Sequence, residues 1–514
     1  MALLRPIATI GGYTLISRVL GFLRDVLVAA YLGAGPIADA FFIAFKFPNF
    51  FRRLFAEGAF NAAFVPMFAG LVATTGRAAA KRFAEDAMAV LLAALFLLLI
   101  VAELAMPVIM RGLAPGFVSD PAKFALAVDL TRITFPYLLF ISLVSLQGGV
   151  LNSLDQFGAV AFTPVLLNLC LIGSLIGLAG LAPTPGHALA WGVAGAGVAQ
   201  FLWLAWATGR ADMALSLPWP RPTPEVKRLL TLMLPAALGA GVVQVNLLID
   251  IVIASLLPTG AVSYLYYADR IYELPLAVIG IAIGTALLPA LSRQARRGET
   301  AAAVATLNRG LEAALLLSLP ATAALVVLPL PIISVLFERG AFGAAEASAT
   351  AAALAAYAVG LPAYVLIKVL TPGFYAREDT RTPVKIAVVA VVLNTSVALA
   401  LMGPLAHVGI ALATAVSAWL NVAALTVVLH RRGYLVPDAA LLRRVPRMVV
   451  ASAVMGAALW VLVPLLSAWL TGGLVLRATA LVFLVIAGLV VFAGAALITG
   501  AADRAELRRL FKRA

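Results

Sequence analysis

ISRVLGFLRDVLVAAYLG, residues 16–33, decides how the chain must be interpreted. The stretch is almost wholly apolar, and with the residues before it the run exceeds the length of about 20 residues that a helix needs to cross a bilayer. It nevertheless holds Arg18, Arg24 and Asp25. A charge near the bilayer centre costs about 3 kcal/mol or more on insertion scales. The stretch therefore predicts a membrane helix whose charged side chains face protein or water.

The composition extends this interpretation to the whole chain. Of its 514 residues, 63% are hydrophobic and 12% are charged, and the mean hydropathy is +1.05. A soluble domain carries about 25% charged residues. The protein is therefore expected to be an integral membrane protein. The formal charge of +14 does not indicate nucleic-acid binding here, because basic residues collect on the cytoplasmic loops of membrane proteins.

Fourteen segments are apolar and long enough to span the membrane, which predicts an all-α integral membrane protein. Several exceed the minimum length, so we expect tilts or kinks, and prolines such as Pro48 and Pro136 would supply kinks. The predicted spans lie near residues 7–33, 36–70, 85–112, 124–152, 157–181, 187–208, 227–257, 261–292, 307–337, 346–375, 382–402, 405–431, 445–469 and 473–499.

The basic residues of the connections predict the orientation. Both termini and the connections after every even-numbered span hold most of the 37 Lys and Arg residues. The opposite set of connections holds only Arg111, Lys123, Arg339 and Arg477. Because positive loops stay in the cytoplasm, we expect both termini on the cytoplasmic side of the membrane.

The two halves of the chain also resemble each other. RDVLVAAYLGAG (24–35) aligns with IDIVIASLLPTG (249–260), which places Asp25 on Asp250. VLLN (165–168) likewise aligns with VVLN (391–394). Six spans separate the copies, so the halves are parallel and related by an axis along the membrane normal, with a cavity between them. We predict six-helix lobes at 1–220 and 221–440, and two further helices with a basic cytoplasmic tail at 441–514.

Eight basic residues fall inside predicted spans. Helical spacing places Arg18 and Asp25 on one face of the first span, with Ser17 and Arg24 on the adjacent stripe. Asp269 and Glu273 accompany Arg270 in the eighth span. The eight are Arg18, Arg24, Lys46, Arg52, Arg53, Arg132, Arg270 and Lys368.

Two explanations of these charges remain open. Internal ion pairs would join Arg24 to Asp25 or Asp39, Arg53 to Glu57, and Arg270 to Glu273. The alternative is an anionic substrate in a central cavity, because the positive charges outnumber the acids in the first two spans and the guanidinium fork suits phosphate or carboxylate oxygens.

Asp250 is a separate case. It lies in the seventh span with no basic neighbour nearby in the sequence. An isolated membrane carboxylate is typical of a proton or cation site, but a partner from another helix, such as Lys368, is an equal alternative.

The sequence offers little support for enzymatic chemistry. It contains neither the GxxxxGK[ST] loop of nucleotide-binding proteins nor an HExxH metal motif, and its three His residues are scattered. The connections are too short for a soluble catalytic domain. A transporter is therefore expected rather than an enzyme.

Several of the charged motifs resemble a known family. Arg18, GFLRD (21–25), ADAFFIAFKFPNFFRRLFAEGAFNAAFVP (38–66) and YADRIYELP (267–275) are similar to those of the MurJ (MviN) family, the bacterial lipid II flippases of the MOP transporter superfamily. The likeness runs along nearly the whole chain. The pattern FxxPNFxRRLFAEGAFxxAFVP, here at 45–66, is long and specific.

The resemblance implies a fold and a function. Members move lipid II, the undecaprenyl-diphosphate-linked disaccharide-pentapeptide, to the outer leaflet for peptidoglycan synthesis. Their two six-helix lobes form a V around a cationic cavity that alternates access, and the last two spans form a groove for the lipid tail. We expect a monomer that contacts membrane lipids and binds no nucleic acid.

The resemblance also assigns residues. No cofactor is implied except a sodium ion in some relatives, for which Asp250 and Thr395 are the candidate ligands here. The gate is expected at Asp25, Asp39 and Glu57. The predicted substrate-binding residues are Arg18, Arg24, Arg52, Arg270, Lys46, Arg53, Asn49, Ser17 and Ser263.

Two other transporter classes share parts of this pattern. A cation-coupled exporter of the MATE type shares the superfamily, but an acidic cavity would suit its cationic drugs better. A flippase for another polyprenyl-linked oligosaccharide would share the basic cavity.

Overall fold

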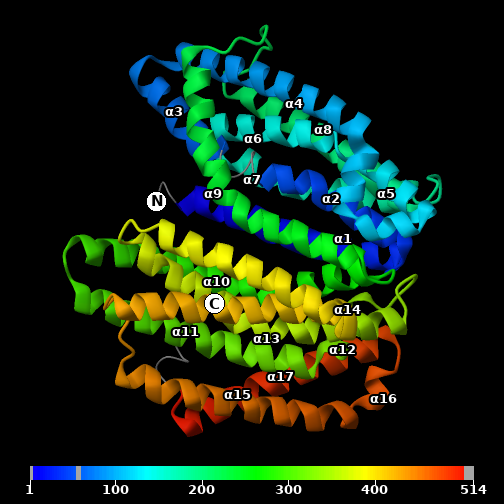
Figure 1. Cartoon of the computed structure of the whole chain (residues 1–514), viewed down its shortest axis with the longest axis vertical. Helices are drawn as coiled ribbons and strands as arrows, with labels where there is room; N and C mark the ends of the chain where they lie inside the picture. Colours follow the sequence, from blue (N-terminus) through cyan, green and yellow to red (C-terminus); the bar gives the residue numbers. More distant parts are fainter. Residues whose placement is uncertain (1–3, 54–59, 503–514) are drawn as a thin grey trace. The chain divides into compact units, whose positions relative to one another are not determined.

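The structure, a computed structural model, describes residues 4–53 and 60–502. Within these ranges the backbone is helical, and the only β-type pairing is an isolated bridge between Arg339 and Phe342. The helices, labelled in Figure 1, are α1 (Leu4–Leu32), α2 (Pro36–Phe51), α3 (Asn61–Thr74), α4 (Arg77–Leu113), η2 (Pro115–Ser119), α5 (Pro121–Thr134), α6 (Tyr137–Ser153), α7 (Phe157–Leu178), α8 (Pro185–Arg210), α9 (Pro224–Ser255), α10 (Ala261–Arg296), α11 (Thr300–Val327), α12 (Pro329–Phe337), α13 (Ala344–Tyr375), α14 (Arg381–Arg431), α15 (Ala439–Leu465), α16 (Ser467–Leu470) and α17 (Leu474–Thr499).

The predicted class is confirmed, whereas the number of spans stays a prediction. Ten helices in the described part of the chain are long and apolar enough to cross a membrane. One of them, α14, has 51 residues and a break at Ala406, where φ is 47°. At about 1.5 Å per residue, α14 is long enough to cross a hydrocarbon core of about 30 Å twice. The predicted spans 382–402 and 405–431 meet beside this break.

The chain divides into two compact units. The first contains Met1–Ser263 and the short segment Arg339–Phe342, and the second contains Tyr264–Glu338 and Gly343–Ala514. The boundary at Ser263 falls inside the first turn of α10. The predicted lobes at 1–220 and 221–440 rest on the internal repeat, which compactness does not test, so that division stays a prediction.

Helices of the first unit pack through small and aromatic side chains. Helix α7 packs along both α1 and α8, and α2 packs on α5. Phe64 stacks on Phe60, Phe68 and Phe83, with ring centroids 5.0–5.6 Å apart. Gly149 of α6 faces Phe64 so closely that a Cβ would come within 2.9 Å of the ring. The cluster therefore sets the spacing of α3, α4 and α6.

Pro48 lies inside α2, the helix that carries Lys46 and leads to Arg52 and Arg53. A proline inside a helix removes one backbone N–H and leaves the carbonyl four residues earlier without its usual partner. That carbonyl belongs to Ala44, and the buried hydroxyl of Thr134 on α5 donates to it at 2.9 Å. The polar group is thus satisfied without water, so α2 continues past Pro48 toward Asn49 and Arg52.

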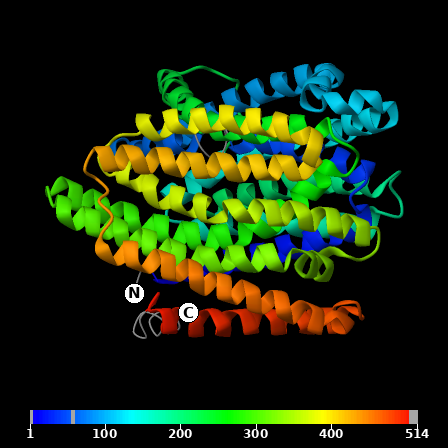
Figure 2. The same ribbon diagram turned by 60° about the horizontal axis from the view of Figure 1, so that its bottom comes forward.

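The second unit is built on α11, α13 and α14, with α15 and α17 attached (Figure 2). A core of Leu328, Met448, Leu459, Leu484 and Phe492 joins these parts. Helices α15 and α17 lie side by side in both views. This pair corresponds to the two C-terminal helices expected beyond the repeat.

A charged loop closes the connection between α13 and α14. The carboxylate of Asp379 accepts hydrogen bonds from the Thr382 backbone N–H at 2.9 Å and from the Arg432 guanidinium at 2.6 Å. The hydrogen bonds from Thr382, together with that from Arg432, hold the pKa of Asp379 well below its usual range. The carboxylate therefore stays ionised and ties the start of α14 to its end.

Candidate transport site

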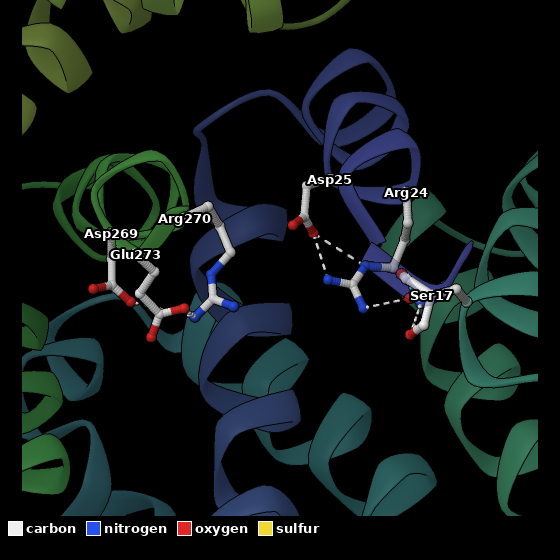
Figure 3. A network of polar contacts seen from close by, with 7 residues as sticks. Ser17, Arg24, Asp25, Asp269, Arg270 and Glu273 are labelled. Carbon is white, nitrogen blue, oxygen red and sulfur yellow. Dashed lines mark hydrogen bonds and ion pairs between the residues drawn. The ribbon is translucent and has the colours of Figure 1, made fainter. Parts of the chain in front are cut away.

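Arg24 is held by two partners in the first unit (Figure 3). Its Nε and Nη2 donate to Asp25 Oδ1 at 3.0 and 2.7 Å, and its Nη1 donates to Asn168 Oδ1 at 3.0 Å. Only 13% of the Arg24 side chain and 8% of the Asp25 side chain are exposed. The charge is therefore compensated locally, and the direction of the guanidinium is fixed by a side chain from α7.

Asn168 also holds α1 itself. Its Nδ2 donates to the backbone carbonyl of Ser17 at 3.0 Å and lies 3.4 Å from the Ser17 hydroxyl. A Cβ at Gly21 would stand 3.5 Å from the same amide. The amide is 5% exposed and thereby links Ser17 to Arg24, two predicted site residues. The sequence singled out Asn168 only through the internal repeat.

Arg18, the remaining predicted residue of α1, is exposed, whereas Asp25 is buried. The seven-residue spacing places both residues on one face of the helix, because an ideal helix drifts by only about 20° over seven residues. The two positions therefore differ in how much protein covers that face along α1.

Asn49 and Arg52 form a second local pair. Asn49 donates from Nδ2 to the carbonyl of Phe45 at 2.7 Å and accepts from Arg52 Nε at 2.9 Å. The amide thus orients the guanidinium one turn further along. Lys46 is half-buried and Arg53 is exposed. Glu57, the predicted partner of Arg53, lies outside the described residues.

The charged cluster of α10 belongs to the second unit. Arg270 Nη2 lies 3.3 Å from Asp269 Oδ2 and 3.2 Å from Glu273 Oε2, as Figure 3 shows. The guanidinium also stands 5.1 Å from the centre of the Tyr266 ring. The predicted pair of Arg270 with Glu273 is confirmed. Both acids lie on the same helix as the arginine.

Asp39 is the centre of a buried polar node in the first unit. Its Oδ1 accepts from the backbone N–H and the hydroxyl of Ser263 at 3.0 and 2.6 Å. Its Oδ2 accepts from the Gly260 N–H at 2.8 Å and from Lys123 Nζ at 2.7 Å. The predicted residues Asp39 and Ser263 are therefore brought together. The partner of Asp39 is Lys123 of α5, which the sequence placed in an exposed connection.

The node lies among four connections that the sequence predicts on one side of the membrane. Two glycines, Gly33 and Gly116, each allow one of these connections to approach the backbone of another segment closely. At Gly33, where φ is 62°, a Cβ would come within 2.4 Å of the Ala341 carbonyl oxygen, and at Gly116 within 2.0 Å of the Ser255 carbonyl oxygen. The N–H of Ala341 donates to the Ala30 carbonyl at 2.8 Å. These contacts close this end of the first unit tightly.

The two candidate sodium ligands are placed separately. Asp250 on α9 accepts from Asn246 Nδ2 at 3.4 Å, and Asp250 belongs to the first unit. Thr395 on α14 donates to the Val391 carbonyl of its own helix at 3.0 Å and belongs to the second unit. The described residues contain no group of three His, Cys, Asp or Glu side chains that would hold a metal ion.

Helices long enough to cross a membrane, with guanidinium and carboxylate groups fixed inside them, define a multi-pass membrane protein. Residues 28–480 match the family model described as lipid II flippase MurJ. A probable lipid II flippase MurJ of Rhizobium meliloti (strain 1021) is 47% identical over 519 residues, which cover 100% of this chain and 97% of the relative. The corresponding protein of Rhizobium tropici is 46% identical over 521 residues, again covering 100% and 97%. The chain belongs to the MurJ family, whose members are transporters rather than enzymes.

Solved structures agree on the fold. A lipid II flippase MurJ in an inward closed conformation superposes with a TM-score of 0.78 at 24% identity, covering 95% of this chain and 98% of the other. An inward-facing MATE family multidrug transporter of the MOP superfamily gives 0.64 at 15% identity, covering 81% and 94%. The fold is thus shared with transporters of different cargo, whereas the sequence relatives are MurJ proteins.

Proposed function

We propose that this protein is a lipid II flippase, moving undecaprenyl-diphosphate-linked precursor from the inner to the outer leaflet of the cytoplasmic membrane. Full-length similarity to relatives named as lipid II flippases supports the proposal. The observation that carries it at the level of residues is Arg24, a guanidinium fixed inside a membrane helix by Asp25 and Asn168. A cation held at this cost is expected to serve an anion.

A diphosphate suits the proposed binding residues. Arginine presents a planar fork that matches phosphate oxygens in pairs, and charge-assisted hydrogen bonds of this kind are about twice as strong as neutral ones. In this proposal Arg18, Arg24, Arg52 and Arg270 bind the diphosphate, with Lys46, Arg53, Asn49 and Ser17 beside them. Asp25 would yield its place on Arg24 to the phosphate as the substrate enters.

Alternating access completes the proposal. Fourteen spans in two parallel six-helix lobes forming a V would enclose the cavity, with both termini in the cytoplasm and the chain acting as a monomer. Asp25, Asp39 and Glu57 would belong to the gates, with the predicted substrate-binding residue Ser263 beside Asp39. The node at Asp39, with Ser263 and Gly260 as donors, has the properties of a closure that can separate, because its contacts are polar and few. The last two helices would receive the lipid tail.

Depletion of the host's own flippase tests the function. In such cells lipid-linked precursor is expected to accumulate in the inner leaflet, and expression of this chain should restore its appearance in the outer leaflet. Arg111→Ala, which removes an exposed arginine outside the proposed site, serves as the matched control for arginine variants.

The competing functions give different results in the same cells. A carrier of another polyprenyl-linked oligosaccharide would leave lipid II in the inner leaflet while restoring the other glycan. An exporter of the MATE type would lower the accumulation of a cationic dye without moving lipid II. Either result, with the chain present in the membrane at normal level, contradicts the proposal.

Coupling to sodium is a further part of the proposal and depends on Asp250 and Thr395. Carboxylate and hydroxyl oxygens are hard donors that suit such a cation. Asp250→Asn is expected to slow turnover and remove any sodium dependence while substrate binding persists. If Lys368→Met restores an inactive Asp250→Asn protein, the two residues form a structural pair and the coupling role fails.

A further inference from the structure

The ammonium group of Lys123 is enclosed at the end of the first unit. It lies 2.7 Å from Asp39 Oδ2, 3.3 Å from Thr259 Oγ1 and 4.1 Å from the centre of the Phe117 ring. Only 4% of its side chain is exposed. Three neighbours thus surround a group that carries three N–H donors. Lysine is almost never fully buried unless it is paired.

The local sequence places Lys123 there. Asp120 caps α5 and accepts from the Lys123 backbone N–H at 3.1 Å, and Pro121 occupies the first turn, where a missing N–H costs nothing. These residues start α5 so that Lys123 points at α2, on which α5 packs. Lys123 and Asp39 therefore lie on two helices that pack on each other, whereas Gly260 lies just before α10 and Ser263 lies in its first turn.

This arrangement separates the contacts of Asp39 into two kinds. The contact with Lys123 joins two helices that pack on each other. The contacts with Gly260 and Ser263 join α2 to the first turn of α10. Only the second kind has to break if α10 moves away from α2. Lys123 is the counter-ion that lowers the cost of burying the Asp39 carboxylate while Asp39 is in contact with Gly260 and Ser263.

We propose that Lys123 is a positioning residue of the gate: its ammonium neutralises Asp39 and thereby permits the closed contact with Gly260 and Ser263. The role of Lys123 rests on the proposed function in one respect: the contact of Asp39 with Gly260 and Ser263 is taken to open and close during transport. Without the ammonium, the carboxylate in the closed state lacks compensation, whereas in an opened state water would solvate it. Loss of Lys123 therefore favours opening at this end.

A thiol-labelling experiment tests the proposal on the full chain in intact cells. Cys170 is replaced by Ala, and Val262→Cys introduces a reporter of similar size, 3% exposed in the closed contact. A membrane-impermeant maleimide is added from outside. Lys123→Met is expected to raise the initial labelling rate roughly tenfold or more, because breaking a buried ion pair leaves an uncompensated charge. Arg111→Met, the matched removal of an exposed charge, should leave the rate unchanged.

A double-mutant cycle identifies the partner. Asp39→Asn alone leaves the lysine uncompensated and should also raise labelling. In the combined variant both charges are gone and the asparagine oxygen still accepts from Ser263, so labelling should fall below that of either single variant. Lys123→Arg should retain most of the protection. If Lys123→Met accumulates poorly in the membrane, Lys123→Gln, which keeps a donor for Asp39, replaces it.

Three outcomes overturn the proposal. Labelling of Val262→Cys unchanged by Lys123→Met means that the ammonium does not hold the contact. Equal labelling in the combined variant and the Lys123 single variant means that Asp39 is not its partner. An equal rise with Arg111→Met means that loss of any positive charge is enough. None of these measurements uses lipid II. If the flippase assignment is wrong but the gate proposal is right, the labelling results will be as expected, and the chain will fail to restore lipid II to the outer leaflet of depleted cells.

Discussion

Two arginines inside membrane helices are held in opposite ways. Arg24 of α1 binds Asp25 and also a side chain from another helix, Asn168 of α7. Arg270 of α10 binds Asp269 and Glu273, both on its own helix. The Arg24 side chain is 13% exposed and the Arg270 side chain 28%. In the contacts seen among the described residues, Arg24 faces the acid Asp25, whereas Arg270 faces the two acids Asp269 and Glu273.

If the proposed site binds an anion, the difference predicts how each arginine would respond. The direction of Arg24 is fixed by its contacts with Asp25 and Asn168, so the proposed substrate would meet a guanidinium that is already oriented. Arg270 is held by neighbours that are themselves 32% and 44% exposed, and pairs of this kind contribute about 0.2–1 kcal/mol each. Arg270 can therefore change partners at small cost, whereas Arg24 has to give up a more buried contact with Asp25 to do so.

Loss of either arginine should have the largest effect. Arg24→Ala and Arg270→Ala are each expected to abolish flipping, by roughly 100-fold or more, since a charge-assisted contact contributes about 1.5–3 kcal/mol and a diphosphate makes several. Complementation of flippase-depleted cells, with protein level measured in membranes, checks this. Full growth with both alanine variants as the only copy would refute the headgroup role.

Conservative replacement sharpens the contrast between the two clusters. Arg24→Lys should remain severely impaired, because a lysine cannot donate to Asp25 and Asn168 together in the observed fork geometry. Arg270→Lys should retain about a tenth or more of the activity, since its partners are local and adjustable. Flipping rates of the two variants, each relative to wild type, provide the comparison. Equal losses would mean that the packing around Arg24 does not matter.

Asn168→Leu tests the tertiary contact directly. It removes the acceptor of Arg24 and the donor to Ser17 while keeping similar volume, so a loss of roughly 10–100-fold in flipping is expected. The variant leaves the charge of the site unchanged. Asn168→Asp, which retains an acceptor for Arg24, should recover part of the activity. An Asn168→Leu protein that flips normally would show that Asp25 alone positions the arginine.

The sequence predicted the helical membrane class, most helix positions and the pair of Arg270 with Glu273. It offered Asp25 or Asp39 as the partner of Arg24, and the structure shows Asp25. Those pairs are local, so helical spacing reveals them. It predicted neither Asn168 as the partner of Arg24 nor Lys123 as the partner of Asp39. These residues are 144 and 84 positions away from their partners, and spacing along one helix carries no information about them.

Lys123 shows a second limit of the sequence. Counting basic residues by connection assigned it to the outer side, and such a count treats each one as exposed. What distinguishes it is the cap at Asp120 and the packing of α5 on α2, which place its stem inside the protein. One feature of the sequence could have indicated that Lys123 is buried. It is one of the few basic residues predicted on that side of the membrane, and it follows directly after the start of a helix.

Glu273→Gln should have the smallest effect. It removes one of the two acids beside Arg270, in a pair whose carboxylate side chain is 44% exposed, so the direct loss corresponds to about 0.2–1 kcal/mol. The arginine then keeps Asp269 beside it on the helix, and this pair is neutral, as the pair of Arg24 and Asp25 already is. Flipping should change less than about fivefold, and the affinity for lipid II should rise rather than fall, because a competing anion is gone. Binding of lipid II to the purified variant checks the direction. Weaker binding of lipid II would mean that Glu273 contacts the substrate itself. An acid of the Arg270 cluster would then take part in binding, instead of competing with the substrate for the arginine.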